Sequence, residues 1–134
     1  MKIAGIGVDI VNNKRIEKSI KNNDFINRVF SKEEIAYSKK IKNKTSYFAK
    51  RFAAKESLSK AIGTGFRKGL NFKDISVAND KKGKPYYKLN DNVKKLIYSN
   101  FKVKKIKISL SLADEKKYSI AFSMIHKWLV KIQY

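Results

Sequence analysis

The sequence predicts an α+β fold, in which a small antiparallel sheet packs with one long central helix. The longest helical signal covers residues 45–62, where apolar side chains recur at helical spacing. Residues 105–112 and 117–125 alternate apolar and polar side chains, as the two strands of an antiparallel hairpin do. Because 134 residues suit one compact core, we expect a single domain over residues 1–134.

The N-terminal segment IAGIGVDIV, residues 3–11, is typical of a buried strand. Alternation divides its side chains between two faces, with Ile6, Val8 and Ile10 on one and Gly5, Gly7, Asp9 and Val11 on the other. We expect this strand to be central in its sheet. Since glycines flank Asp9 on its own face, a ligand or another backbone can come close there.

Three short signals lie between this strand and the long helix. An asparagine pair is suited to cap a polar helix over residues 14–23, and a short apolar segment follows at residues 25–30. Ser31 and Glu34 have the spacing of a capping box. We therefore expect another helix over residues 31–41.

The long helix ends at Gly63, a residue suited to a left-handed C-terminal cap. A glycine-bearing loop follows at residues 63–72. Residues 74–79 and 84–89 indicate two strands joined by a turn, and residues 91–100 indicate a helix.

Composition limits the classes of protein to consider. The chain has no cysteine, which excludes disulfides, thiolate metal sites and cysteine nucleophiles. Its N-terminal apolar run is too short to span a bilayer and resembles no cleavable signal, so we expect a cytoplasmic protein that is not inserted in a membrane. The net charge of +21 fits a polyanionic partner and a lysine-rich compositional bias equally well.

Two acidic residues are the candidates for chemistry. Asp9 lies in an apolar strand, where a carboxylate is costly unless it is paired or metal-bound. Glu56 and Lys60 are four residues apart and share one helix face with Phe52. Ordinary ion pairs would account for both carboxylates. Alternatively, the two together would hold a hard cation such as Mg²⁺, with positions left for water and substrate phosphates.

Four motifs together resemble holo-acyl-carrier-protein synthase, the bacterial phosphopantetheinyl transferase of fatty-acid synthesis. They are GIGVDIVNNKRIEK at residues 5–18, RFAAKESLSKAIGTG at residues 51–65, GKP at residues 83–85 and SLS at residues 109–111. Their order and spacing fit the small single-domain members over most of the chain. The resemblance implies the phosphopantetheinyl transferase fold and Mg²⁺-dependent transfer of the phosphopantetheine arm of coenzyme A to a serine of apo acyl carrier protein, releasing adenosine 3′,5′-bisphosphate.

The same motifs imply roles for individual residues. Asp9 and Glu56 match the metal-site residues. Glu56, through the metal or a water that it orders, is the candidate to take the serine proton, and Lys60 would stabilise charge on the phosphates or the departing bisphosphate. The residues implied for coenzyme A binding are Arg51, Lys60, Gly63, Lys84, Pro85, Ser109 and Ser111. Those implied for carrier-protein binding are Arg15, Phe25, Ile26 and Arg28, although Phe25 and Ile26 would also suit the core.

One position departs from the family pattern. Leu112 follows the SLS motif, where the family usually has a histidine. A leucine can neither exchange a proton nor donate a hydrogen bond to a phosphate. We therefore expect an activity that is retained but reduced.

The resemblance also implies a homotrimer, with each coenzyme A cleft formed between adjacent subunits, and no nucleic-acid partner. Two alternatives stay open. A basic nucleic-acid-binding module would explain the charge but not Asp9 or Glu56, which would repel phosphates. An inactive relative that only holds carrier proteins would explain Leu112.

Overall fold

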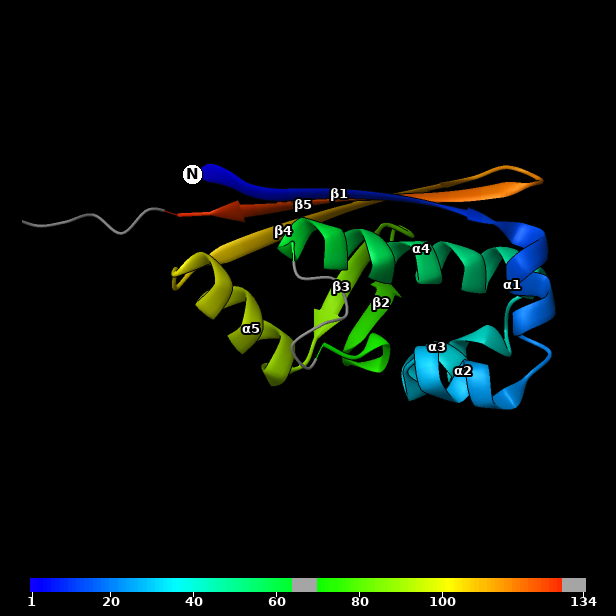
Figure 1. The fold of residues 1–134 in the computed structure, drawn as a ribbon. Helices are drawn as coiled ribbons and strands as arrows, with labels where there is room; N and C mark the ends of the chain where they lie inside the picture. Colours follow the sequence, from blue (N-terminus) through cyan, green and yellow to red (C-terminus); the bar gives the residue numbers. More distant parts are fainter. Residues whose placement is uncertain (64–69, 129–134) are drawn as a thin grey trace, which may run out of the picture.

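A computed structural model describes residues 1–63 and 70–128, and within them two antiparallel sheets surround a long helix (Figure 1). This arrangement agrees with the predicted α+β class. In chain order the elements are β1 (Lys2–Asn12), α1 (Asn13–Ser19), α2 (Asn23–Val29), α3 (Lys32–Ser38), α4 (Lys44–Ile62), a short 3₁₀ helix (Phe72–Asp74), β2 (Ile75–Asn79), β3 (Pro85–Leu89), α5 (Asp91–Phe101), β4 (Ile106–Asp114) and β5 (Tyr118–Lys127).

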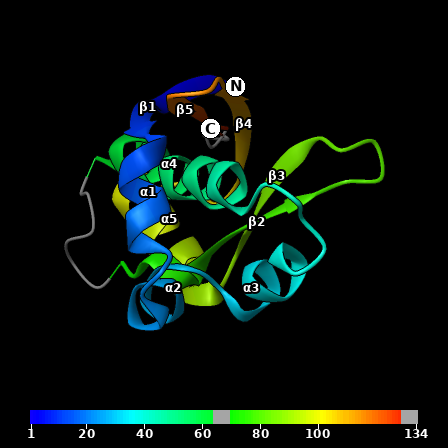
Figure 2. The ribbon, with the colours of Figure 1, turned by 90° about the vertical axis from the view of Figure 1, so that its right-hand side faces the viewer.

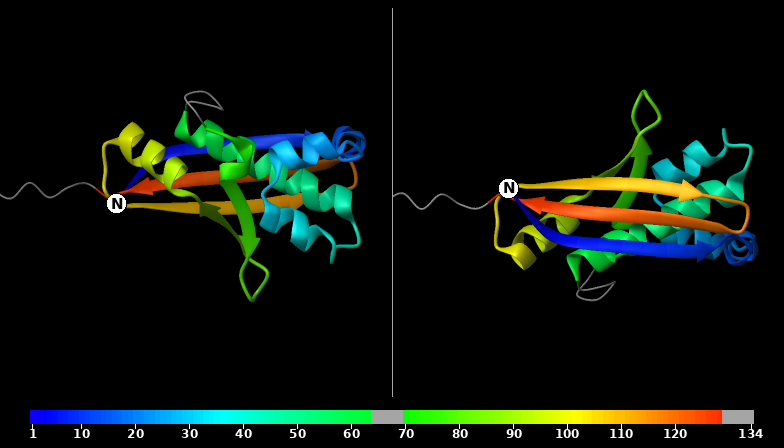
Figure 3. Two further views of the ribbon diagram at one scale, coloured as in Figure 1. Left: turned by 90° about the horizontal axis from the view of Figure 1, so that it is seen from below. Right: turned by 90° about the horizontal axis from the view of Figure 1, so that it is seen from above.

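The elements are arranged in layers around α4. The larger sheet has the strand order β1-β5-β4, with both neighbouring pairs antiparallel. Helix α4 lies along one face of this sheet, and the β2–β3 hairpin, α5 and the short helices lie on the other side of α4 (Figure 1). The β2–β3 hairpin reaches out past the edge formed by β4, on the side opposite β1 (Figures 2 and 3).

The sequence of α4 explains its length and its burial. The Asn43 side chain accepts a hydrogen bond from the Ser46 backbone N–H at the first turn, and Gly63 adopts a left-handed conformation (φ 92°) as the C-terminal cap. The predicted cap at Gly63 is thereby confirmed, and the helix begins one residue before its predicted start. Side chains such as Phe48 and Leu58 are buried. None of the described helices, α4 included, has both the length and the apolar character needed to cross a membrane.

The two glycines of β1 place its backbone directly against α4. A Cβ added at Gly5 would overlap the carbonyl oxygen of Ala61, and one added at Gly7 would overlap that of Ser57. No side chain therefore separates the strand from the helix at these positions. The expectation that the glycine face admits another backbone is confirmed, and that backbone is α4.

The expectation that β1 is a buried, central strand is wrong. β5 occupies the centre of the larger sheet, and β1 forms one edge. The face opposite α4 leaves Ile6, Val8 and Ile10 exposed by 58%, 55% and 61%. Alternation of side chains shows that a strand has two faces, but it does not show whether both are covered within one chain.

The remaining differences are local. The helix predicted over residues 14–23 is shorter and ends at Ser19. Residues 25–30 were predicted only as an apolar segment, and most of them belong to α2. The capping box of Ser31 and Glu34 is confirmed, with both of its hydrogen bonds present. Most of the predicted glycine-bearing loop, residues 64–69, lies outside the described residues.

Replacing Gly7 by alanine tests the contact between β1 and α4. Because the new Cβ would meet backbone atoms that cannot rotate away, we expect the free energy of unfolding to fall by about 3 kcal/mol. Gly83→Ala is the matched control, since the described structure leaves open space around its added Cβ and only its positive φ of 85° opposes the change, at a cost of about 1 kcal/mol. Urea denaturation measures both variants, and equal losses would contradict the close contact.

Candidate active site

Asp9, Glu56 and Lys60 meet where α4 crosses β1. Asp9 lies two residues beyond Gly7 on the face of β1 that contacts α4. The Lys60 ammonium donates a hydrogen bond to Asp9 Oδ1 at 3.1 Å and another to the Val8 carbonyl oxygen at 3.0 Å. Glu56 lies one turn earlier on the same helix. The glycine contact thus brings together the three residues that were predicted to be catalytic.

Both carboxylates are partly buried, and both have raised pKa values. Burial is the main cause of the raised pKa of Asp9, and it is opposed by the hydrogen bond and charge of Lys60 and by the charge of Arg15. Burial also raises the pKa of Glu56, the negative charge of Asp9 raises it further, and the charge of Lys60 lowers it. The two carboxylates are therefore close enough to repel each other, and a bound cation would relieve this repulsion.

An open pocket of about 300 Å³ lies beside the two carboxylates. Its lining consists of Asp9, Ile10, Val11, Arg15, Ile16, Ser19, Phe25, Phe52 and Glu56. The rings of Phe25 and Phe52 lie 6.2 Å apart and give the pocket an apolar wall. The helix face that Phe52 shares with Glu56 is the sequence signal for its place in the wall of the pocket. The pocket therefore combines negative, positive and apolar surfaces.

The oxygen donors of this site suit Mg²⁺. Mg²⁺ is usually held by one or two carboxylates together with waters and substrate phosphates. Asp9 and Glu56 supply two carboxylates beside an open pocket. Within residues 1–63 and 70–128 no cluster of three or more His, Cys, Asp or Glu side chains is placed to hold a metal ion. The site is therefore suited to a cation whose other ligands come from water and phosphate.

The four predicted carrier-binding residues do not all lie at the pocket. Arg15 and Phe25 line the pocket beside Asp9 and Glu56. Phe25 and Ile26 both pack against the hydrophobic core around α4, as the alternative interpretation expected. Arg28 is exposed in the last turn of α2. The pocket thus opens next to one cation and one aromatic side chain that could contact a partner.

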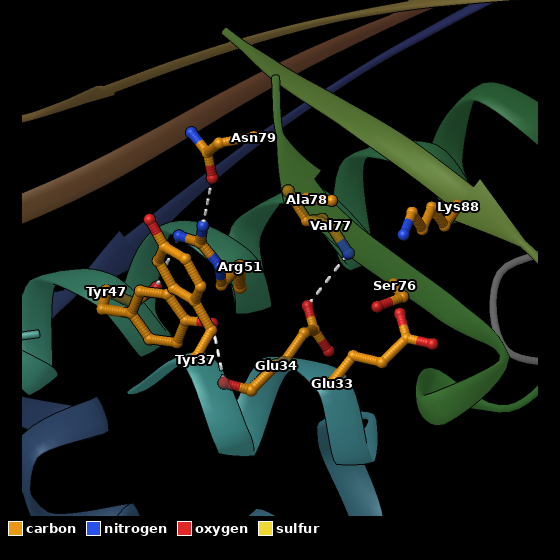
Figure 4. Close-up of a pocket in the computed structure, with 10 residues that line it drawn as sticks. All are labelled: Glu33, Glu34, Tyr37, Tyr47, Arg51, Ser76, Val77, Ala78, Asn79 and Lys88. Carbon is orange, nitrogen blue, oxygen red and sulfur yellow. Dashed lines mark hydrogen bonds between the residues drawn. The ribbon is translucent and has the colours of Figure 1, made fainter. Parts of the chain in front are cut away.

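Arg51 lies in a different pocket, of about 230 Å³, between α3, α4 and β2 (Figure 4). Its side chain is only 5% exposed, its guanidinium lies 3.8 Å from the centre of the Tyr47 ring, and one of its N–H groups donates to Asn79 Oδ1 at 2.6 Å. Its Nε has no hydrogen-bond partner among the described residues. Tyr47, one turn before Arg51, was not predicted, and its i,i+4 spacing is the only sequence signal for it.

The other residues predicted to bind coenzyme A are spread over the chain. Gly63 ends α4, Lys84 and Pro85 lie at the start of β3, and Ser109 and Ser111 are exposed on β4. The structure does not bring this set to Asp9 and Glu56 within one chain. On β4 the two serines point away from α4, on the same face of the sheet as the exposed residues of β1.

Leu112 points to the other face of β4. It is partly buried and packs against the hydrophobic core around α4. The leucine therefore has a structural role in place of the chemistry that a histidine would supply. The expected reduction in activity stays a prediction.

A buried ion pair that the sequence pattern did not indicate fixes α4 to its neighbours. Lys55 Nζ lies 2.6 Å from Glu34 Oε1, and both side chains are fully buried. Lys55 also donates to the carbonyl oxygens of Phe72 and Ile75, and Glu34 accepts a hydrogen bond from the Val77 backbone N–H. The burial of a lysine inside a helix has no simple sequence signal. Since Lys55 precedes Glu56, this network also fixes the rotation of α4 at the site.

Comparisons with known proteins agree with the fold. Residues 5–123 match the 4′-phosphopantetheinyl transferase superfamily. The holo-[acyl-carrier-protein] synthase of Pelagibacter ubique is 59% identical over 127 residues, which cover 95% of this chain and 99% of that protein. The crystal structure of the Neisseria meningitidis holo-[acyl-carrier-protein] synthase aligns with a TM-score of 0.85 at 35% identity, covering 94% of this chain and 100% of that one. A Bacillus anthracis holo-(acyl-carrier-protein) synthase in complex with CoA (3′,5′-ADP) aligns with a TM-score of 0.78 at 34% identity, covering 94% and 98% of the two chains.

The fold is therefore that of a phosphopantetheinyl transferase. Within this class, the chain belongs to the holo-[acyl-carrier-protein] synthase family. The resemblance found in the sequence and the predicted fold class are confirmed, and the enzyme reading is favoured over a nucleic-acid-binding module.

Replacing Glu56 by glutamine tests the electrostatics of the site. A carboxyl group whose pKa is higher in the folded than in the unfolded protein costs stability once it ionises, so ionised Glu56 destabilises the fold at neutral pH. We expect Glu56→Gln to raise the free energy of unfolding at pH 7 by about 0.5 kcal/mol, a small value because the side chain is only partly buried. The gain should disappear as the pH falls below the ordinary value of 4.5, where the carboxyl group is protonated in both states.

Denaturation at pH 7 and at acidic pH measures this effect. Glu17→Gln is the control, because Glu17 is an exposed carboxylate on α1 that does not line the pocket of Asp9 and Glu56. A loss of stability in Glu56→Gln at pH 7 would contradict the description of the site.

Proposed function

We propose that this enzyme transfers the 4′-phosphopantetheine arm of coenzyme A to a serine of an apo acyl carrier protein in fatty-acid biosynthesis, with Asp9, Glu56 and Lys60 at the reaction centre. The observation that carries this proposal is the meeting of these three side chains beside an open pocket in a chain of this family. We further propose that the reaction takes place in the cytoplasm.

Asp9 and Glu56 would hold Mg²⁺. When bound, this ion would neutralise the pyrophosphate of coenzyme A and act as a Lewis acid at the phosphorus. Both carboxylates must be ionised to hold it. Their raised pKa values therefore favour metal binding at neutral rather than acidic pH.

Protein side chains would accept the proton of the attacking serine and stabilise the negative charge on the phosphates. The serine oxygen attacks the β-phosphorus of coenzyme A, and the bond from that phosphorus to the departing adenosine 3′,5′-bisphosphate breaks. Glu56 takes the serine proton directly or through a water. The Lys60 ammonium stabilises negative charge on the phosphate oxygens.

Arg15 and the aromatic wall of the pocket would receive the carrier protein. Arg15 is exposed at the rim of the pocket, and Phe25 and Phe52 present apolar surface next to it. Such a combination suits an acidic helix with apolar side chains, because complementary charge speeds encounter and apolar contact retains the partner. The serine of the bound carrier would then enter beside Glu56.

Intact-protein mass spectrometry tests the activity. We expect an apo acyl carrier protein incubated with this enzyme, coenzyme A and Mg²⁺ to gain the mass of one phosphopantetheine. A chelator should abolish the gain, and Glu56→Ala should slow it by about a hundredfold or more. Binding of coenzyme A and carrier without any mass gain would contradict the proposal and indicate an inactive relative.

We also propose that the active enzyme is a homotrimer. The face of the larger sheet opposite α4 exposes an apolar patch made of Ile6, Val8, Ile10, Ile120 and Phe122. Paired positions on β1 and β5 make this patch continuous, and a continuous exposed apolar patch is typical of an interface. A cyclic assembly would cover the patch with copies of itself.

The arrangement of the predicted site residues supports the same assembly. Asp9 and Glu56 lie at the edge formed by β1, whereas the β2–β3 hairpin, with Lys84 and Pro85 at its β3 end, projects past the opposite edge formed by β4 (Figure 3). Arg51 lines a pocket against β2 of this hairpin. In a cyclic trimer the β1 edge of one subunit would face the β4 edge of the next, so that both groups of residues would contact one coenzyme A.

Mixing two inactive variants tests the shared cleft. Glu56→Ala and Arg51→Ala, unfolded together in equal amounts and refolded, should recover about one quarter of the wild-type activity, because that fraction of interfaces in a random cyclic trimer has both intact residues. Each variant refolded alone is the control, and light scattering should give a trimer. No recovery from a correctly assembled mixture would contradict a cleft shared between subunits.

A further inference from the structure

We propose that Lys60 and the divalent cation compete for Asp9, so that metal binding releases the Lys60 ammonium towards the substrate phosphate. This inference rests on the metal site proposed above. The new element is a coupling between the bound cation and the Lys60 ammonium at that site.

The contact with Lys60 occupies one oxygen of the mostly buried Asp9 carboxylate. The ammonium bonds to Asp9 Oδ1 at 3.1 Å and to the neighbouring Val8 carbonyl oxygen at 3.0 Å. The Asp9 side chain is only 15% exposed, whereas the Lys60 side chain is 54% exposed. The Lys60 ammonium therefore occupies an oxygen that a cation bound at Asp9 Oδ1 would need.

The two partners differ in their freedom to move. Asp9 extends from a β-strand that is held against α4 by Gly5 and Gly7. Lys60 is on the exposed side of the last turn of α4 and carries its charge on a flexible four-carbon chain. When a cation binds Asp9, the ammonium is the component that can move away.

Electrostatic repulsion between the bound cation and the Lys60 ammonium also drives the ammonium away from Asp9. Three charged groups act on Asp9 in the described structure: Lys60 through a direct hydrogen bond, Arg15 through space, and Glu56, whose carboxylate repels it. A divalent cation on the same oxygen would lie within a few ångströms of the ammonium and would repel it. The released ammonium would then be free to bind phosphate oxygens, which arrive with coenzyme A.

This coupling predicts the sign of a binding change. Competition means that removing the Lys60 ammonium tightens metal binding, and by reciprocity the metal weakens the contact between Lys60 and Asp9 to the same extent. A lysine that only positions Asp9 would have the opposite effect, since its removal would loosen the carboxylate and weaken metal binding.

Titration of the full chain with Mn²⁺ alone, followed by the electron paramagnetic resonance signal of the free ion, tests the proposal. We expect Lys60→Met to tighten Mn²⁺ binding by roughly fivefold to tenfold. Lys60→Arg keeps the charge and should bind Mn²⁺ as the wild type does. Arg15→Met is the matched control, because it removes a cation that acts on Asp9 without touching it, and it should change the affinity by less than about twofold. The titration is run at pH 8, because Lys60 and Arg15 both lower the pKa of Asp9 and their removal raises it.

The possible outcomes separate the two proposals. Unchanged or weaker binding in Lys60→Met, or an equal gain in Arg15→Met, would overturn the competition while leaving the metal site intact. Asp9→Asn tests the site itself and should weaken Mn²⁺ binding strongly. If Asp9→Asn binds Mn²⁺ as the wild type does, the metal site and the competition are both wrong.

Discussion

The contact between the β1 backbone and α4 is the constraint on which the rest of the molecule depends. Because Gly5 and Gly7 carry no side chains, the helix lies directly on the strand, and the next inward-facing residue of β1 is Asp9. One turn of α4 then carries Glu56 and Lys60 to the same place. Two carboxylates thus become neighbours through a packing contact, despite their mutual repulsion.

The fixed position of α4 has a second source on its other side. The buried pair of Lys55 and Glu34 ties the helix to α3 and β2. A helix held by backbone contact on one side and by a buried ion pair on the other has little freedom to rotate. This rigidity allows a site built from only a few side chains to keep its geometry.

Sequence patterns predicted the features that depend on local signals. Alternation predicted the strand segments, and helical spacing with capping chemistry predicted the long helix and its glycine cap. Motif spacing predicted that Asp9 and Glu56 belong to one site. The sequence did not predict the edge position of β1 or the burial of Lys55, because both depend on which other segments pack against them. Nothing local in residues 3–11 shows that β1 is an edge strand, and nothing local at Lys55 shows that its ammonium is buried. Both depend on contacts between segments far apart in the sequence.

A crystal structure with Mn²⁺ and coenzyme A tests the central claim most directly, since the anomalous signal locates the metal independently of any variant. The account predicts a peak that contacts Asp9, Glu56 and the pyrophosphate of coenzyme A, with the Lys60 ammonium turned from Asp9 to a phosphate oxygen. A metal bound elsewhere, or a coenzyme A pyrophosphate remote from Asp9 and Glu56, would contradict it.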